Sequence, residues 1–120
     1  MATVSINSKI EPDTLKARVN NEAVMHLSLK NEDPEKTYWC ECEIKVSPPL
    51  SLAHDKELNA GRTRIGILKP NASLEKPIKL YTRPNNFPDE YKFIVTAYVY
   101  DEDGAIAERV EKPESIRCVE

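Results

Sequence analysis

The amino-acid sequence alternates between apolar and polar residues with a period of two, and this alternation restricts the fold more than any other feature. In residues 38–46 every second side chain is apolar, and these side chains would share one face of an extended strand: Tyr38, Cys40, Cys42, Ile44 and Val46. The period of 3.6 residues that is typical of an amphipathic helix is almost absent from the chain. The sequence therefore predicts an all-β protein.

The same alternation recurs along the chain and predicts further strands. Strong patterns cover residues 22–30 and 90–100. Weaker patterns cover residues 4–10, 15–19, 50–53, 64–68, 74–81 and 105–110. Asp103 and Gly104 are a hairpin signal, because both residues tolerate a positive φ, and one helical turn is expected near residues 53–59. Seven to nine short strands separated by turns at regular intervals are typical of an antiparallel β-sandwich.

Proline is unusually frequent and glycine unusually rare, with nine and three residues respectively. Because proline has no N–H to donate to a β-ladder, we expect it at strand ends and in turns. Most of the prolines fit such positions: Pro12, Pro34, Pro48, Pro49, Pro70, Pro84, Pro88 and Pro113. Pro113 is expected to interrupt the last strand, which would resume at residues 115–119. Pro77 falls inside a predicted strand and marks that strand as an edge or as bulged.

Length and composition define the class of protein. The 120 residues predict one domain over residues 1–120, which is long enough to bury its own core. The formal net charge is −3 and no basic stripe occurs, so nucleic acid is not an expected partner. No apolar run approaches the length of a membrane span, so no membrane is expected either. Turns rich in proline and poor in glycine restrict the unfolded chain, which predicts a rigid module of thermophilic character.

The first residues and the cysteines bear on the compartment. The N-terminal segment lacks a basic stretch followed by an apolar one, so no secretory signal is expected. Three cysteines are an odd number and fit poorly with the disulfide framework of a secreted domain. The sequence therefore predicts a cytoplasmic location, or an extracellular one if the chain is part of a surface protein.

Sequence motifs of catalysis are absent. No Gly-x-Ser-x-Gly elbow, His-Glu-x-x-His pair or glycine-rich phosphate loop occurs. Glu41 and Glu43 resemble a catalytic carboxylate pair, but charged residues that alternate outward on a strand are usually just solvated. The sequence therefore predicts a protein that is not an enzyme and carries no cofactor.

Three short segments carry a family resemblance. Residues 25–31 read Met-His-Leu-Ser-Leu-Lys-Asn, an alternating strand that closes on asparagine. Residues 67–73 read Ile-Leu-Lys-Pro-Asn-Ala-Ser, with Asn71 in place of the usual glycine, and residues 88–95 read Pro-Asp-Glu-Tyr-Lys-Phe-Ile-Val, a strand opened by a tyrosine. In these features the chain resembles the immunoglobulin-like sandwich modules of the CARDB and adhesion type found in bacteria and archaea. The resemblance implies a spacer or interaction domain, not an enzyme.

Trp39 has the opposite parity to the apolar face of residues 38–46 and is therefore predicted to face outward. In such a sandwich residues 90–100 would lie beside this strand, and their second face carries Ile94, Tyr98 and Tyr100. These four residues predict an aromatic patch on the outer face of the sheet that holds residues 38–46, 90–100 and 105–110, the C, F and G strands. Clustered tryptophan and tyrosine often anchor a binding surface. The alternative is that an N-terminal strand, a loop or the C-terminal tail covers the patch.

The patch leads to the predicted function, a non-enzymatic interaction or structural module. Its partner would be another protein or a second copy of the chain, and a homodimer would suit one self-complementary patch. No metal site or catalytic residue is part of this prediction.

The alternative function belongs to a different class, a small thiol- or metal-binding protein that uses Cys40, Cys42 and Cys118. Cys40 and Cys42 are two residues apart on one strand face, roughly 6–7 Å from each other. Cys118 could approach them from a neighbouring strand. The simpler interpretation is that Cys40 and Cys42 are small core residues, because cysteine is among the most buried residue types.

Overall fold

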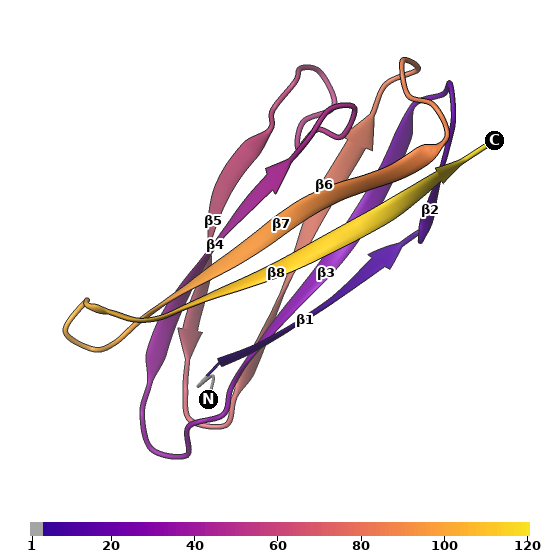
Figure 1. The fold of residues 1–120 in the computed structure, drawn as a ribbon. Helices are drawn as coiled ribbons and strands as arrows, with labels where there is room; N and C mark the ends of the chain where they lie inside the picture. Colours follow the sequence, from indigo (N-terminus) through magenta and orange to yellow (C-terminus); the bar gives the residue numbers. More distant parts are fainter. Residues whose placement is uncertain (1–3) are drawn as a thin grey trace.

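Two β-sheets stack face to face in the computed structural model, which describes residues 4–120 (Figure 1). The strands are β1 (Val4–Glu11), β2 (Thr14–Lys16), β3 (Asn21–Asn31), β4 (Tyr38–Val46), β5 (Ala60–Leu68), β6 (Ser73–Thr82), β7 (Asp89–Tyr100) and β8 (Ile106–Val119). The smaller sheet has the order β1-β3-β6 and the larger one β2-β8-β7-β4-β5. The described residues contain no helix, so the predicted all-β immunoglobulin-like sandwich of seven to nine strands is confirmed.

The N-terminal segment contributes to both sheets. β1 pairs antiparallel with β3 in the smaller sheet, and the chain then crosses at Pro12 so that β2 pairs with β8 in the larger sheet. Pro12 suits this crossing because it cannot donate to a ladder. The β2–β8 pair is parallel, whereas every other strand pair among the described residues is antiparallel.

The core lies between the two sheets and is built by the alternation seen in the sequence. The inward side chains are almost wholly buried, and the central strands β3, β4 and β7 supply most of them: Ala23, Met25, Leu27, Leu29, Cys40, Cys42, Ile44, Val46, Phe93, Val95, Ala97 and Val99. Each large apolar side chain buried in this way contributes roughly 1.5–3 kcal/mol of transfer free energy. The alternation of β4 is therefore the sequence signature of a half-buried strand with its apolar face inward.

The last strand differs from the prediction, because β8 runs through Pro113 without interruption. β2 pairs only with the residues from Arg117 to Val119, so β8 has no partner on its outer side at Pro113. A proline on such an edge deprives the sheet of no ladder hydrogen bond. The edge position predicted from Pro77 is confirmed, since β6 is the outermost strand of the smaller sheet.

The segment between β4 and β5 also differs from the prediction. Residues 53–59 form bends and no helical turn, and the strand expected at residues 50–53 is reduced to one bridge between Ser51 and Tyr81. The Ser51 hydroxyl replaces regular structure here. It donates to the carbonyl of Lys56 at 2.8 Å and accepts from the N–H groups of Ala53 and Leu58. A side chain that bonds local backbone groups in this way competes with secondary structure.

Two buried asparagines hold the connections at opposite ends of the sandwich. At one end, the Asn31 side chain donates to the carbonyls of Lys36, Leu68 and Lys69. At the other end, the Asn86 side chain donates to the carbonyl of Lys16 and accepts from the N–H of Arg18. Asn31 closes the motif that resembles CARDB strands, and its hydrogen bonds give a physical reason for an asparagine there.

Tyr91 fixes the connection between β6 and β7. Its hydroxyl donates to the carbonyl of Phe87 and accepts from the N–H of the same residue at 3.0 Å. This contact between a tyrosine near the start of the strand and backbone a few residues upstream is the tyrosine corner of immunoglobulin-like domains. The hydrogen bonds of its hydroxyl thus give a physical reason for a tyrosine at the start of the predicted strand.

We expect Tyr91→Phe to lower the free energy of unfolding by about 1–3 kcal/mol, because the backbone groups of Phe87 lose their partner. The measurement is urea unfolding followed by fluorescence. The matched control is Tyr81→Phe, since the hydroxyl of Tyr81 makes no hydrogen bond within residues 4–120. Equal stability of the two variants would contradict the role given to the Tyr91 hydroxyl.

Candidate functional site

The outer face of the larger sheet carries side chains that line up across four strands. Trp39 on β4 lies opposite Tyr100 on β7 and opposite Ile67 on β5, and Tyr100 lies opposite Ile106 on β8. Trp39 and Ile67 face outward because the residues that follow them, Cys40 and Leu68, are buried, and Tyr100 and Ile106 lie in register with Trp39. We call these four side chains the apolar row. Three interstrand spacings give the row a length of roughly 14 Å. The row joins residues that are far apart in the sequence.

Trp39 and Tyr100 form the centre of the apolar row. Their rings stack with centroids 4.0 Å apart and an interplanar angle of 14°. Because each ring covers one face of the other, both side chains are half-buried although they lie on the outer surface. Stacked aromatic pairs contribute roughly 0.5–1.5 kcal/mol beyond the area they bury. The stack therefore gives the surface a fixed, rigid centre.

Arg62 contacts both Tyr98 and the centre of the apolar row. Its guanidinium lies 4.4 Å from the ring centroid of Tyr98, and its Nη2 donates to the hydroxyl of Tyr100 at 3.0 Å. Its Nε also pairs with a carboxylate oxygen of Glu41 at 3.0 Å. An exposed ion pair alone contributes little to stability. Three contacts from one planar group nevertheless fix the orientation of the tyrosines on the surface.

The structure brings together three of the four residues that the sequence predicted for the binding patch. Trp39, Tyr98 and Tyr100 are adjacent and half-buried, and the side chains over the Trp39 and Tyr98 rings are arginines of the neighbouring strands β5 and β8, not residues of an N-terminal strand or a terminal segment. Ile94 is 43% exposed but lies four residues from Tyr98 along β7, roughly 13 Å away. The binding role of these four residues stays a prediction.

The sequence did not predict Arg62, Arg64 and Ile67 as members of this face. The reason is a β-bulge in β5, which interrupts the alternation. Cys40 pairs with Gly66 and Glu41 pairs with Arg64, so Ile65 has no partner on β4. Gly66 adopts a φ of 131°, which suits glycine at such an irregularity. In β5 the residues that face outward therefore have even numbers before the bulge and odd numbers after it. Simple alternation does not predict that they share one face.

A hollow opens beside Trp39 on the β5 side. It is lined by Trp39, Arg64, Gly66 and Ile67, has a volume of about 560 Å³ and is mostly apolar. The guanidinium of Arg64 lies 5.9 Å from the ring centroid of Trp39 at its margin. Ile67 is 64% exposed. The hollow offers an indole and an aliphatic wall next to a positive charge.

Arg64 differs from three other cations of this face, Lys45, Arg62 and Arg109. Glutamates pair with Lys45, Arg62 and Arg109 at 3.6, 3.0 and 2.9 Å. For Arg64 no carboxylate partner occurs among residues 4–120. Its charge is therefore available to an anionic group that enters the hollow.

The three cysteines do not meet, so the predicted thiol or metal site is wrong in this respect. Cys42 lies opposite Ala97 on β7 and Cys118 lies opposite Asp89, a separation of roughly 26 Å along the strand. No group of His, Cys, Asp or Glu suited to a metal ion occurs in the described part of the chain. Burial raises the pKa of Cys40 and Cys42 to about 12. The two thiols are core residues held in their protonated, unreactive form.

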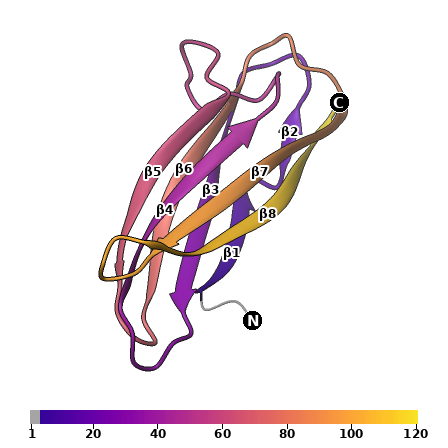
Figure 2. The same ribbon diagram turned by 60° about the vertical axis from the view of Figure 1, so that its left-hand side comes forward.

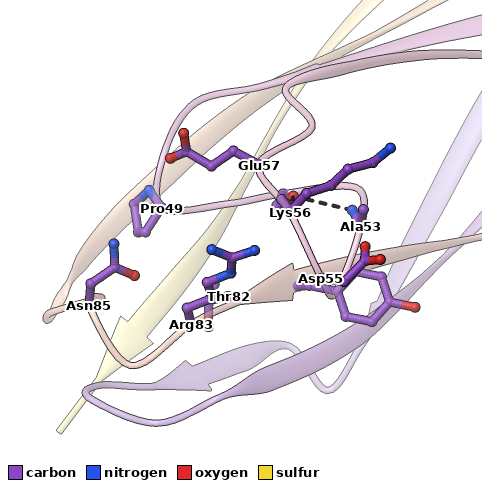
Figure 3. Close-up of a pocket in the computed structure, with 10 residues that line it drawn as sticks. Pro49, Ala53, Asp55, Lys56, Glu57, Thr82, Arg83 and Asn85 are labelled. Atoms are coloured by element: carbon purple, nitrogen blue, oxygen red, sulfur yellow. Dashed lines mark hydrogen bonds between the residues drawn. The ribbon is translucent and has the colours of Figure 1, made fainter.

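A second hollow lies at the end of the sandwich, between the β4–β5 connection and the end of β6 (Figure 3). Its walls mix both signs of charge, from Asp55, Lys56, Glu57 and Arg83. Figure 3 shows Lys56 and Glu57 extending in opposite directions instead of converging on one point. Binding sites need polar groups that converge on a ligand. The outer face of the larger sheet is therefore the stronger candidate.

No protein-family model matches the chain, and no curated protein sequence matches it. Solved structures are similar in fold. The major pilin subunit BcpA of Bacillus cereus aligns over 97% of this chain with a TM-score of 0.63 and 10% identity. The chain spans 40% of the length of that subunit. The CARDB domain of the PF1109 protein from Pyrococcus furiosus, solved with di-metal ions, aligns over 98% of this chain and 90% of its own, with a TM-score of 0.54 and 16% identity.

These similarities confirm the predicted resemblance to immunoglobulin-like modules of the CARDB and adhesion type at the level of the fold. A further similar structure, AvmM, which catalyses macrocyclization in alchivemycin A biosynthesis, has a TM-score of 0.53 and 11% identity. One architecture thus carries a pilin domain, a CARDB domain and a catalyst, so the fold alone does not select a function. Among the described residues there is also no helix long and apolar enough to cross a membrane.

We expect all three thiols to react slowly with a maleimide while the protein is folded. The thiolate is the reacting species, and a pKa of about 12 leaves roughly one thiol in ten thousand ionised at pH 8 for Cys40 and Cys42. Cys118 is protected by burial. The measurement is the labelling rate by mass spectrometry in the absence and presence of denaturant. Rapid labelling of the folded protein at any of the three cysteines would contradict this account.

Proposed function

We propose that the chain is a non-enzymatic interaction module that binds another protein through the outer face of β4, β7 and β8, together with the adjoining β5. The observation that carries this proposal is the apolar row, whose ends are Ile67 and Ile106, 64% and 60% exposed. Tryptophan, tyrosine and arginine are the residue types that most often anchor protein interfaces. The row contains tryptophan and tyrosine, and arginines lie directly beside it.

The charges on this face support a protein partner. Glutamates and arginines alternate beside the apolar row, with pairs between Arg62 and Glu41 and between Arg109 and Glu111. A surface of mixed sign fits a protein partner of mixed sign, and it disfavours a polyanion. A second copy of the chain carries the same mixture, so self-association, a homodimer included, is part of the proposal.

The face is small for a stable interface. The four strands span roughly 14 Å, and the four side-chain rows from Tyr100 to Ile94 span roughly 20 Å along the strands. With the margins of the side chains, this gives several hundred Å² for each partner. A stable interface usually buries about 800 Å² on each side. The module would therefore form a weak, reversible complex, strengthened where several modules act together.

The absence of enzymatic activity remains part of the proposal. The candidate face presents stacked rings and mutually paired charges, whereas a catalytic site usually holds titratable groups with shifted pKa values in a cleft. The cytoplasmic location stays a prediction, because buried thiols such as these would also persist in an oxidising compartment. The similar pilin domain is compatible with an extracellular location.

We expect the double variant Trp39→Ala, Tyr98→Ala to abolish self-association and the capture of a partner, because it removes the centre of the face. The parent protein should show a mass above that of the monomer in light scattering at high concentration. Both side chains are half-buried on the surface, so the variant should stay folded, which circular dichroism checks.

The matched control is Tyr81→Ala, which removes an aromatic side chain from the outside of the smaller sheet. It should leave both association and partner capture unchanged. The proposal fails if the parent protein is a monomer at every concentration and if the double variant captures the same proteins from a cell extract as the parent does.

A further inference from the structure

The β6–β7 connection presents an aromatic side chain to solvent. Phe87 is 57% exposed, although the side chain of its neighbour Asn86 is buried. The acidic residues Asp89 and Glu90 follow after Pro88 and are exposed as well. A large apolar side chain next to carboxylates on a projecting loop has the composition of an interface anchor with a charged margin.

The backbone that carries Phe87 is held in place on both sides. The hydroxyl of Tyr91 bonds both the N–H and the carbonyl of Phe87. The side chain of Asn86 is hydrogen-bonded to the backbone where β2 ends, at Lys16 and Arg18. A loop that is already ordered has little conformational freedom to lose when it binds. Phe87 is therefore exposed on a preorganised loop.

The hollow beside Trp39 complements this loop in apolar character and charge. Its indole and Ile67 offer apolar walls for one aromatic side chain, and Arg64, which has no carboxylate partner in residues 4–120, stands at its margin. The carboxylates next to Phe87 would meet the guanidinium of Arg64 when the ring enters the hollow. Among the large apolar side chains that residues 4–120 expose, Phe87 is the aromatic one.

The loop and the hollow lie at opposite ends of the molecule, as Figures 1 and 2 show for the β6–β7 connection and the β7–β8 hairpin. Phe87 precedes the first residue of β7, whereas Trp39 lies opposite Tyr100 at its last residue, which is a separation of roughly 36 Å. The loop of one copy thus cannot reach its own hollow. A contact between them must join two copies.

We propose that the Phe87 loop of one copy inserts into the hollow formed by Trp39, Arg64 and Ile67 of a second copy. This inference rests on the proposed function and names the partner surface. Because the two contacting surfaces differ, the interface is head-to-tail, and it repeats into chains or rings instead of closing as a symmetric dimer.

The test is a complementation experiment with two variants, Phe87→Ala and Trp39→Ala. Light scattering should show that the parent protein forms species larger than two copies as its concentration rises. Each variant alone should lose association by roughly tenfold or more, since one buried aromatic contact is removed. An equimolar mixture should form a one-to-one complex and nothing larger, because each variant keeps one intact half of the interface. Arg64→Glu should weaken association as well.

The outcomes separate this inference from the proposed function. If Phe87→Ala associates like the parent protein while Trp39→Ala does not, the head-to-tail inference is overturned and the outer face remains the interaction surface. The inference is also overturned if both variants are monomers and their mixture stays monomeric, as for a symmetric dimer. If neither variant changes association or partner capture, both proposals fail.

Discussion

The antiparallel pairing of β4 with β7 is the constraint on which the rest of the structure depends. Its register places Cys40, Cys42 and Ile44 opposite Val99, Ala97 and Val95, which fills the core between the sheets. The same register places Trp39 opposite Tyr100 on the outer side. A shift by one residue would exchange the two faces, exposing the core and burying the charges. Stability and the candidate surface therefore follow from one ladder.

Each end of the sandwich is stabilised by a buried asparagine that lies below the connections. The Asn31 side chain donates hydrogen bonds to carbonyls near the β5–β6 turn. The Asn86 side chain is hydrogen-bonded to backbone groups where β2 ends. Connections with few glycines and many prolines add stability, because proline lowers the conformational entropy of the unfolded chain. The molecule is 49 Å long, and its hydrogen-bonded ends lie far apart. An elongated molecule with different surfaces at its two ends is the geometry that the proposed head-to-tail contact requires.

Much of the fold could be predicted from the sequence because alternation is a local signal. The bounds of β4 agree with the predicted residues 38–46, β3 is one residue longer than its prediction at each end, and β7 begins one residue earlier than predicted. The outward position of Trp39 also followed from parity alone. Pro113 misled the prediction, since a proline breaks a strand only where its missing N–H has a partner to lose. Among the described residues β8 has no such partner at Pro113, because β2 is short and pairs only farther along β8. No local sequence pattern predicts the length of β2.

The sequence by itself determined the fold class, the inward faces of the strong strands and the outward aromatic residues, because side-chain parity belongs to each strand. Only the tertiary structure decided which strands lie side by side, since pairing joins residues far apart in the chain. That order separates Cys118 from Cys42 and brings Ile67 and Ile106 to the ends of one apolar row. It also places Arg64 beside Trp39 through a bulge that breaks the alternation of β5. The candidate surface is thus a product of strand order and register.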